Sequence, residues 1–79
     1  MTLTVQYFAI LREQRGLGQE TLETSAATPD ALYAELRARH GFTLPGDRIR
    51  AAVNDTFVAG DAPLRAGDRI VFIPPVAGG

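Results

Sequence analysis

Hydrophobic and polar residues alternate at the start of the chain. Leu3, Val5 and Tyr7 share one side of the alternation, and two threonines and a glutamine share the other, with the period of two that marks a half-buried strand. Phe8 breaks the pattern, because a strand continued to this residue places its aromatic ring on the polar face. We therefore predict a strand over residues 2–8 in which Phe8 needs a covering segment or a partner.

A different period marks the one long helix that the sequence predicts, over residues 28–41. Leu32 and Leu36 fall on one face of this segment and form the stripe that packs on a sheet. Thr28 is a suitable N-cap, and Gly41 suits the left-handed position that follows the last helical residue.

Shorter patterns predict the remaining elements. These are a helix or turn over 9–15, an edge strand over 19–24, a strand over 49–53, a short return strand at 57–58 and a strand over 69–73 that is buried on both faces. This order predicts an α+β domain with one main helix packed on a mixed sheet of about five strands. We expect residues 1–73 to form the domain and residues 74–79 to form a flexible, extended tail.

The final residues have an unusual composition. Pro74 and Pro75 follow the last strand, favour extended polyproline II backbone and have no N–H to give to a sheet. Gly78 and Gly79 have no side chain, so they fit through a channel too narrow for other residues. We expect the tail to leave the domain and to present the terminal carboxylate.

Size and composition limit the possible functions. The chain has 79 residues, of which 46% are hydrophobic and 22% are charged, which predicts one small globular domain with little interior for a substrate pocket. We therefore do not expect the chain to be an enzyme acting alone. The absence of cysteine excludes disulfides, thiolate metal sites and thiol catalysis by this chain.

The charge pattern narrows the class of partner. The formal net charge is -1 and the isoelectric point is near 5.7, so we expect neither nucleic acid nor a membrane as the partner. No stretch has the roughly 18 apolar residues of a membrane span, and we expect a cytoplasmic protein. All 8 cationic side chains are arginines, so no lysine is present to accept an isopeptide bond.

Few side chains are candidates for a site. Phe8, Phe57 and Ile73 could form an apolar docking patch around the tail, although each could equally be an ordinary core residue. Arg12 could pair with an acidic group of a partner or be a solvated charge. His40, in the last turn of the predicted helix, is interpreted as structural. The aspartates fall in turns with no metal-loop spacing, so no metal site is predicted.

Three segments together resemble a known family. They are Tyr7–Glu13, Ala51–Thr56 and Gly67–Gly79, and the closing segment is the most specific of the three. Across nearly the whole chain they are similar to the small subunit of molybdopterin synthase, the MoaD family of sulfur carriers. That family has a β-grasp fold like that of ubiquitin, which agrees with the predicted order of elements.

The resemblance implies a carrier that works with several partners. A ubiquitin-activating-enzyme-like adenylyltransferase would use ATP to adenylate the carboxylate of Gly79. Sulfur from a sulfur donor enzyme would then replace AMP and leave a thiocarboxylate. The tail that carries the thiocarboxylate, including Gly78, would enter the large subunit, which forms a heterotetramer with the carrier. There it would deliver sulfur to cyclic pyranopterin monophosphate in the synthesis of the molybdenum cofactor. The chain itself would bind no cofactor. Its partner interface would comprise Phe8, Arg12, Phe57, Ile73, Pro74, Pro75 and Val76.

The chemistry of a terminal carboxylate agrees with this scheme. A free α-carboxylate has a pKa of about 3.5, is ionised at neutral pH and is a poor electrophile, so it needs a leaving group before sulfur can replace oxygen. Three alternatives stay open at this point. They are a sulfur carrier for thiamine thiazole or a sulfur amino acid, a ubiquitin-like protein modifier, and an interaction module with an inert tail.

Overall fold

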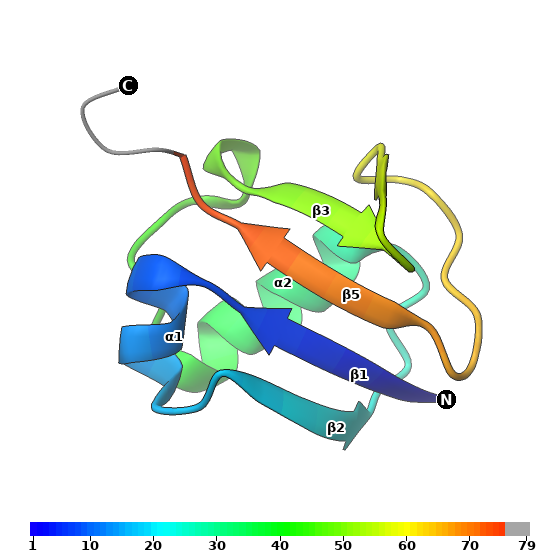
Figure 1. Ribbon diagram of the computed structural model, residues 1–79, viewed down its shortest axis with the longest axis horizontal. Coiled ribbons are helices and arrows are strands. Elements are labelled where there is room, and N and C mark those ends of the chain that lie inside the picture. The colour runs from blue at the N-terminus through cyan, green and yellow to red at the C-terminus, as the bar shows by residue number, and fades with distance from the viewer. Residues whose placement is uncertain (76–79) are drawn as a thin grey trace.

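The first and last strands of the chain lie side by side in the middle of one sheet. The computed structural model describes residues 1–75, and its elements in chain order are β1 (Thr2–Tyr7), α1 (Ala9–Arg15), β2 (Gln19–Glu23), α2 (Pro29–His40), the 3-10 turn η1 (Gly46–Arg48), β3 (Arg50–Val53), β4 (Thr56–Val58) and β5 (Arg69–Ile73). The five strands have the order β2-β1-β5-β3-β4 (Figure 1). β1 and β5 are parallel, and the other neighbouring strands are antiparallel. The predicted mixed sheet with one main helix is confirmed.

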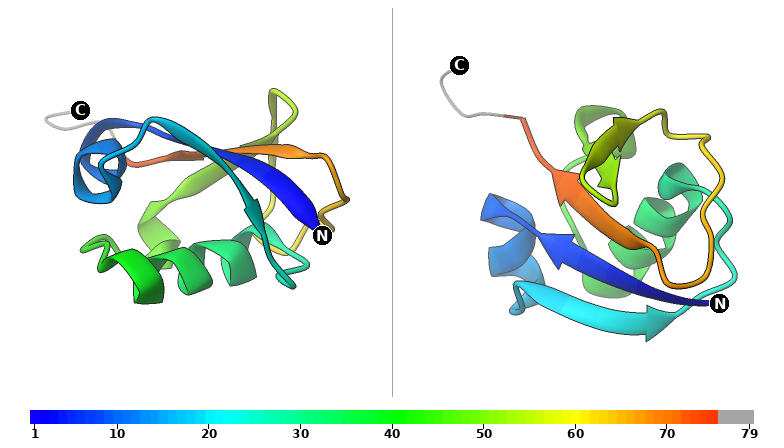
Figure 2. Two further views of the ribbon diagram at one scale, coloured as in Figure 1. Left: turned by 90° about the horizontal axis from the view of Figure 1, so that it is seen from below. Right: turned by 45° about the vertical axis from the view of Figure 1, so that its right-hand side comes forward.

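The core lies between the sheet and α2, which crosses one face of the sheet (Figure 2). β1 and β5 supply the centre of this core, where Val5 pairs with Ile70 and Tyr7 pairs with Phe72. These four side chains are at most 1% exposed. Burying such apolar surface is the main favourable term in folding, and the middle position of β5 agrees with its almost continuous apolar sequence.

α2 begins and ends where the sequence predicts. The Thr28 hydroxyl accepts a hydrogen bond from the Ala31 backbone N–H at 3.2 Å, and Gly41 closes the helix with a φ of 72°. Leu32 and Leu36 are fully buried under the sheet. The opposite face of the sheet, which we call the open face, has no helix over it in the described part of the chain (Figure 2).

The structure differs from the prediction at the ends of elements. β1 ends at Tyr7 rather than at Phe8, because Phe8 keeps an extended backbone but serves as the N-cap of α1. The return strand β4 begins one residue early, since the hairpin turn consists of Asn54 and Asp55 alone, both with positive φ. Residues 42–48, for which the sequence predicts neither helix nor strand, contain η1.

Two further points concern the chain as a whole. Among residues 1–75, no helix has the length and apolar character needed to cross a membrane. The predicted division into a domain of residues 1–73 and a tail of residues 74–79 stays a prediction, because residues 76–79 lie outside the described part of the chain.

Candidate functional site

An apolar groove lies at the edge of the sheet where β1 and β5 both end. Because these strands are parallel and Tyr7 pairs with Phe72, the residues that follow them, Phe8 and Ile73, reach the same edge. The groove has a volume of about 970 Å³ and is open to solvent. We call it the C-terminal groove; it is lined by Phe8, Ala9, Ile10, Leu44, Arg48, Ile73, Pro74 and Pro75.

The walls of the C-terminal groove come from three separate parts of the chain. One wall is the start of α1, which the chain reaches through Ala9 at a φ of 50°, a left-handed conformation that costs a residue with a Cβ about 1–2 kcal/mol. This sharp turn leaves Phe8 43% exposed and Ile10 37% exposed. The opposite wall is the loop that contains η1, and the floor is the end of β5.

The predicted interface residues meet only in part at this groove. Phe8, Ile73, Pro74 and Pro75 all line it. Pro74, which directly follows β5, is buried, and Pro75 is exposed. Val76, Gly78 and Gly79 lie outside the described residues, and their predicted roles stay predictions.

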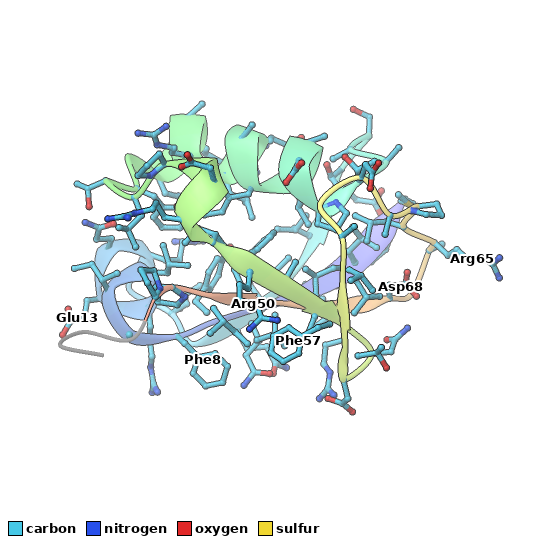
Figure 3. All side chains as sticks on the ribbon, turned by 90° about the horizontal axis from the view of Figure 1, so that it is seen from above. Phe8, Glu13, Arg50, Phe57, Arg65 and Asp68 are labelled. Carbon is cyan, nitrogen blue, oxygen red and sulfur yellow. The ribbon has the colours of Figure 1, made fainter. Side chains whose placement is uncertain are left out.

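Phe57 lies on the open face rather than in the C-terminal groove. It pairs with Ala52 of β3 and is 54% exposed, the most exposed large hydrophobic side chain within residues 1–75. Figure 3 shows Phe57 and Phe8 projecting on the side of the sheet away from α2, together with Arg50. The guanidinium carbon of Arg50 lies 4.2 Å from the centroid of the Phe57 ring. Sequence reasoning missed Arg50, although its place two residues before Ala52 puts it on the same face as Phe57.

Arg12 does not line the C-terminal groove. It is an exposed residue of α1 whose guanidinium lies beside Gly18, where an added Cβ would come within 3.2 Å of the arginine Nε. Arg12 lines a separate surface hollow with Glu13 and Leu17. Its predicted role in a partner interface stays a prediction.

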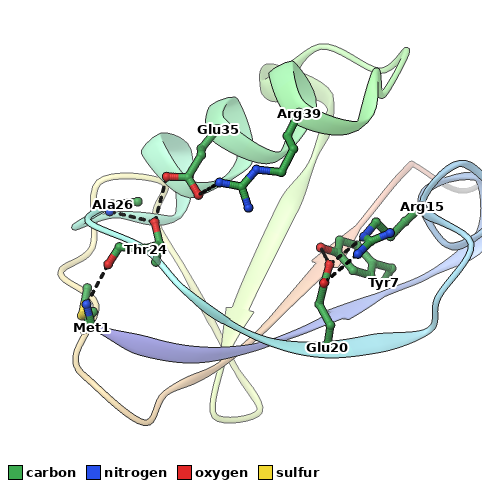
Figure 4. A network of polar contacts seen from close by, with 8 residues as sticks. All are labelled: Met1, Tyr7, Arg15, Glu20, Thr24, Ala26, Glu35 and Arg39. Carbon is green, nitrogen blue, oxygen red and sulfur yellow. Dashed lines mark hydrogen bonds and ion pairs between the residues drawn. The ribbon is translucent and has the colours of Figure 1, made fainter.

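A polar cluster holds α1 in position beside the groove (Figure 4). The Arg15 Nε and Nη2 atoms each donate to the Glu20 carboxylate at 2.8 Å, and the Tyr7 hydroxyl donates to the same carboxylate at 2.7 Å. These hydrogen bonds, first among them those from Arg15, lower the pKa of Glu20 to about 2. Burial and the neighbouring Glu20 carboxylate raise the pKa of Tyr7. The sequence offered a signal for this cluster in the opposite charges that flank the Gly16–Gly18 turn.

Histidine and acidic side chains form no metal-binding cluster in the part of the chain that the structure describes. Within residues 1–75 no group of three or more His, Asp or Glu side chains is placed to hold a metal ion. The His40 ring packs 5.8 Å from the Phe42 ring, and burial lowers the pKa of His40. This packing agrees with the structural role predicted for His40.

Comparison with known proteins decides the family. A family model described as the ThiS family matches residues 5–79. The chain belongs to the ThiS family. Among curated proteins, this ThiS-family chain is 36% identical over 80 residues to the molybdopterin synthase sulfur carrier subunit of Escherichia coli K12, covering 98% of this chain and 99% of that protein. The resemblance to the sulfur carriers of molybdopterin synthase is therefore confirmed.

Solved structures confirm the fold of this ThiS-family chain. A chain in the protein–protein complex of subunits 1 and 2 of the molybdopterin-converting factor from Helicobacter pylori is 28% identical, with a TM-score of 0.68 and 100% of both chains covered. The ubiquitin of Caldiarchaeum subterraneum aligns with a TM-score of 0.64 at 21% identity over 100% of this chain and 98% of that one. The ubiquitin-like β-grasp fold predicted from the sequence is confirmed.

Proposed function

We propose that this protein is a sulfur carrier, the small subunit of a molybdopterin synthase, and that its reacting group is the carboxylate of Gly79. The observation that carries this proposal is the similarity to the sulfur carrier subunit of Escherichia coli over 98% of this chain, together with a family match that extends to Gly79. The C-terminal groove supports it, because an exposed apolar surface surrounds the point where β5 passes into the tail. Large exposed apolar surfaces on small domains are commonly sites of protein association.

The proposed reaction needs groups that this chain does not supply. The Gly79 carboxylate attacks the α-phosphorus of ATP in a partner adenylyltransferase, pyrophosphate leaves, and an acyl adenylate forms. Sulfide released by a donor enzyme then attacks the acyl carbon, forms a C–S bond and displaces AMP, which yields the thiocarboxylate. The chain binds no cofactor in this scheme, and it presents a substrate carboxylate to sites on other proteins.

The partners follow from the same scheme. The Helicobacter pylori complex of subunits 1 and 2 supports a large subunit as one partner. The adenylyltransferase, the sulfur donor enzyme, the heterotetrameric assembly and the cytoplasmic location belong to the proposal. In the large subunit the thiocarboxylate would transfer its sulfur to cyclic pyranopterin monophosphate, and water would add to the acyl carbon to restore the carboxylate of Gly79.

In this proposal the folded domain positions the tail and supplies no reacting group. Pro74 is buried at the point where the backbone leaves β5, and a proline restricts its own φ and the conformation of the residue before it. Exposed Phe8 and Ile10 supply apolar contact area on one side of that point. A partner that buries these side chains would hold the tail in a fixed position and orientation relative to the active site of the partner.

Intact mass spectrometry tests the proposal. The protein is incubated with its adenylyltransferase, ATP and a sulfur donor, and the expected product is heavier by the exchange of one oxygen for sulfur. A variant that lacks Gly79 should melt at the same temperature and show no exchange. Covalent adducts with other proteins would indicate a ubiquitin-like modifier instead, and an unchanged mass would exclude both functions. Complementation of a strain deficient in molybdenum cofactor then separates this pathway from thiamine and sulfur amino acid pathways.

A further inference from the structure

Arg50 is a charged residue within the apolar part of the open face. The β3–β5 register pairs it with Ile73, the last residue before Pro74, and the β3–β4 register places Phe57 diagonally across from it. Two apolar residues of the same face, Ala52 and Val71, are only 7% and 8% exposed although no helix within residues 1–75 covers them. Larger neighbouring side chains therefore cover Ala52 and Val71, and Phe57 and Arg50 lie in this part of the open face.

The guanidinium of Arg50 forms no ion pair and no hydrogen bond within residues 1–75. The ion pairs in that part of the chain involve other groups, namely the Met1 amine with Glu23, Arg15 with Glu20, Arg39 with Glu35, and Arg69 with Asp55. Arginine has five N–H donors in a planar fork, so the domain leaves the donors of Arg50 available. The contact with the Phe57 ring restrains the side chain without using those donors.

A second arginine makes this end of the open face more positive. Arg48 lines the C-terminal groove beside Ile73 and Pro74, and it likewise has no ion pair within the described residues. The acidic residue next to it, Asp47, lines one hollow on the side of α2 and a second hollow together with Arg50, but within residues 1–75 neither arginine forms an ion pair with it. The carboxylates of Asp55 and Glu23 are bound to other groups of the chain.

We propose that Arg50 is a specificity-determining residue that receives a carboxylate of the large subunit when that subunit docks on the open face. This inference rests on the function proposed above and adds the chemistry of the partner surface, which is an apolar recess for Phe57 with an Asp or Glu beside it. A guanidinium buried without a partner is strongly unfavourable, whereas its planar fork matches a carboxylate in two parallel hydrogen bonds. A protein that offers an apolar or cationic group at this point is therefore rejected.

The affinity for the large subunit of the same organism tests this proposal. R50M removes the charge and keeps an unbranched apolar stem, and R65M removes an equal charge at the other end of the sheet, where Arg65 lies far from Phe57 (Figure 3). We expect R50M to raise Kd on the order of 10- to 100-fold, mainly through faster dissociation, and to make binding less sensitive to salt. R65M should change Kd by less than about twofold. Both variants should melt like the wild type.

A third variant separates charge from geometry. R50K keeps the positive charge but loses the planar fork and the stacking on Phe57, so its Kd should lie between those of wild type and R50M. Equal Kd values for wild type and R50M would overturn the role of Arg50 and leave the proposed function intact. A defect of R50M confined to thiocarboxylate formation would overturn the choice of the large subunit. Failure of the wild-type protein both to bind the large subunit and to gain sulfur would instead overturn the proposed function.

Discussion

The two faces of the sheet differ in how many of their side chains are buried or paired by other residues of the domain. On the face covered by α2, the large side chains of β1 and β5 are at most 1% exposed, and no buried side-chain N or O atom within residues 1–75 lacks a hydrogen-bond partner. On the open face, the half next to β2 is polar and internally paired, as in the contact of Thr2 with Glu23. The half near β3 and β4 instead exposes Phe57 and the guanidinium of Arg50, which has no ion pair within residues 1–75.

This difference separates stability from recognition. A covered apolar side chain contributes to the free energy of folding, whereas an exposed one contributes mainly when a partner covers it. Substitutions on the two faces should therefore give different results in two measurements, unfolding of the isolated domain and affinity for a partner. The predictions below test this separation.

The largest effect on folding is expected for a core residue on the covered face. L36A should lower the free energy of unfolding by about 2–5 kcal/mol, because Leu36 is fully buried and its truncation leaves a cavity. Urea denaturation measures this loss. The matched variant L17A makes the same change at a leucine that is 43% exposed, and its cost should stay below about 1 kcal/mol. Equal costs for the two variants would contradict the assigned core.

The next largest effect is expected for binding and not for folding. F57A should weaken affinity for the large subunit by about 10- to 100-fold, since aromatic side chains at the centre of interfaces carry much of the binding free energy. The unfolding free energy should change by less than about 0.5 kcal/mol, because Phe57 is 54% exposed. F57L, which keeps an apolar side chain, should retain part of the affinity. A large loss of unfolding free energy in F57A with unchanged affinity for the large subunit would contradict the assignment of the two faces.

Acid should weaken the polar cluster that holds α1. The pKa of Glu20 is lowered to about 2 in the folded protein from 4.5, so its contribution is complete above pH 4.5 and is lost as the pH falls from there towards 2. We expect a loss of about 1–2 kcal/mol, because solvent partly reaches this pair. Unfolding followed between pH 6 and pH 2 measures it. E20Q should lack this part of the pH dependence, and E13Q, which alters an exposed carboxylate of α1, should retain it.

The smallest effect is expected at the start of α2. T28A removes the hydroxyl that accepts from the Ala31 N–H and should cost about 1 kcal/mol of unfolding free energy. T28S keeps an acceptor at the same place and should recover most of that loss. Affinity for the large subunit should be the same in both variants, because α2 lies on the covered face. A change in affinity would show that the two faces are coupled.

The elements of the fold were predictable because each one depends on a short pattern. Alternation defines β1, the cap residues Thr28 and Gly41 define α2, and an unbroken apolar run defines β5. Element ends were less predictable where one residue serves two elements, as Phe8 does between β1 and α1.

The site was predictable only in its apolar residues. Strand parity singled out Phe8 and the position after a turn singled out Phe57. Both are exposed, whereas the sequence left burial in the core equally open, and their role in a partner interface stays a prediction. The C-terminal groove could not be foreseen, because its opposite wall comes from the loop of Leu44 and Arg48, and no local pattern brings that loop to the end of β5. The contact of Arg50 with Phe57 depends on the register between β3 and β4. The length of the turn at Asn54 sets this register, and the sequence alone did not give that length correctly.

The central pairing of β1 with β5 also constrains how the protein is made. The strand in the middle of the sheet is the last one to be synthesised, so the two halves of the sheet have no common partner until residue 73 is available. Pairing of segments so distant in sequence makes folding slower, because a long loop must close before the contacts form. A prematurely terminated chain would therefore lack the middle of its sheet rather than an edge. Only chains translated through β5 would acquire both a stable domain and the C-terminal groove.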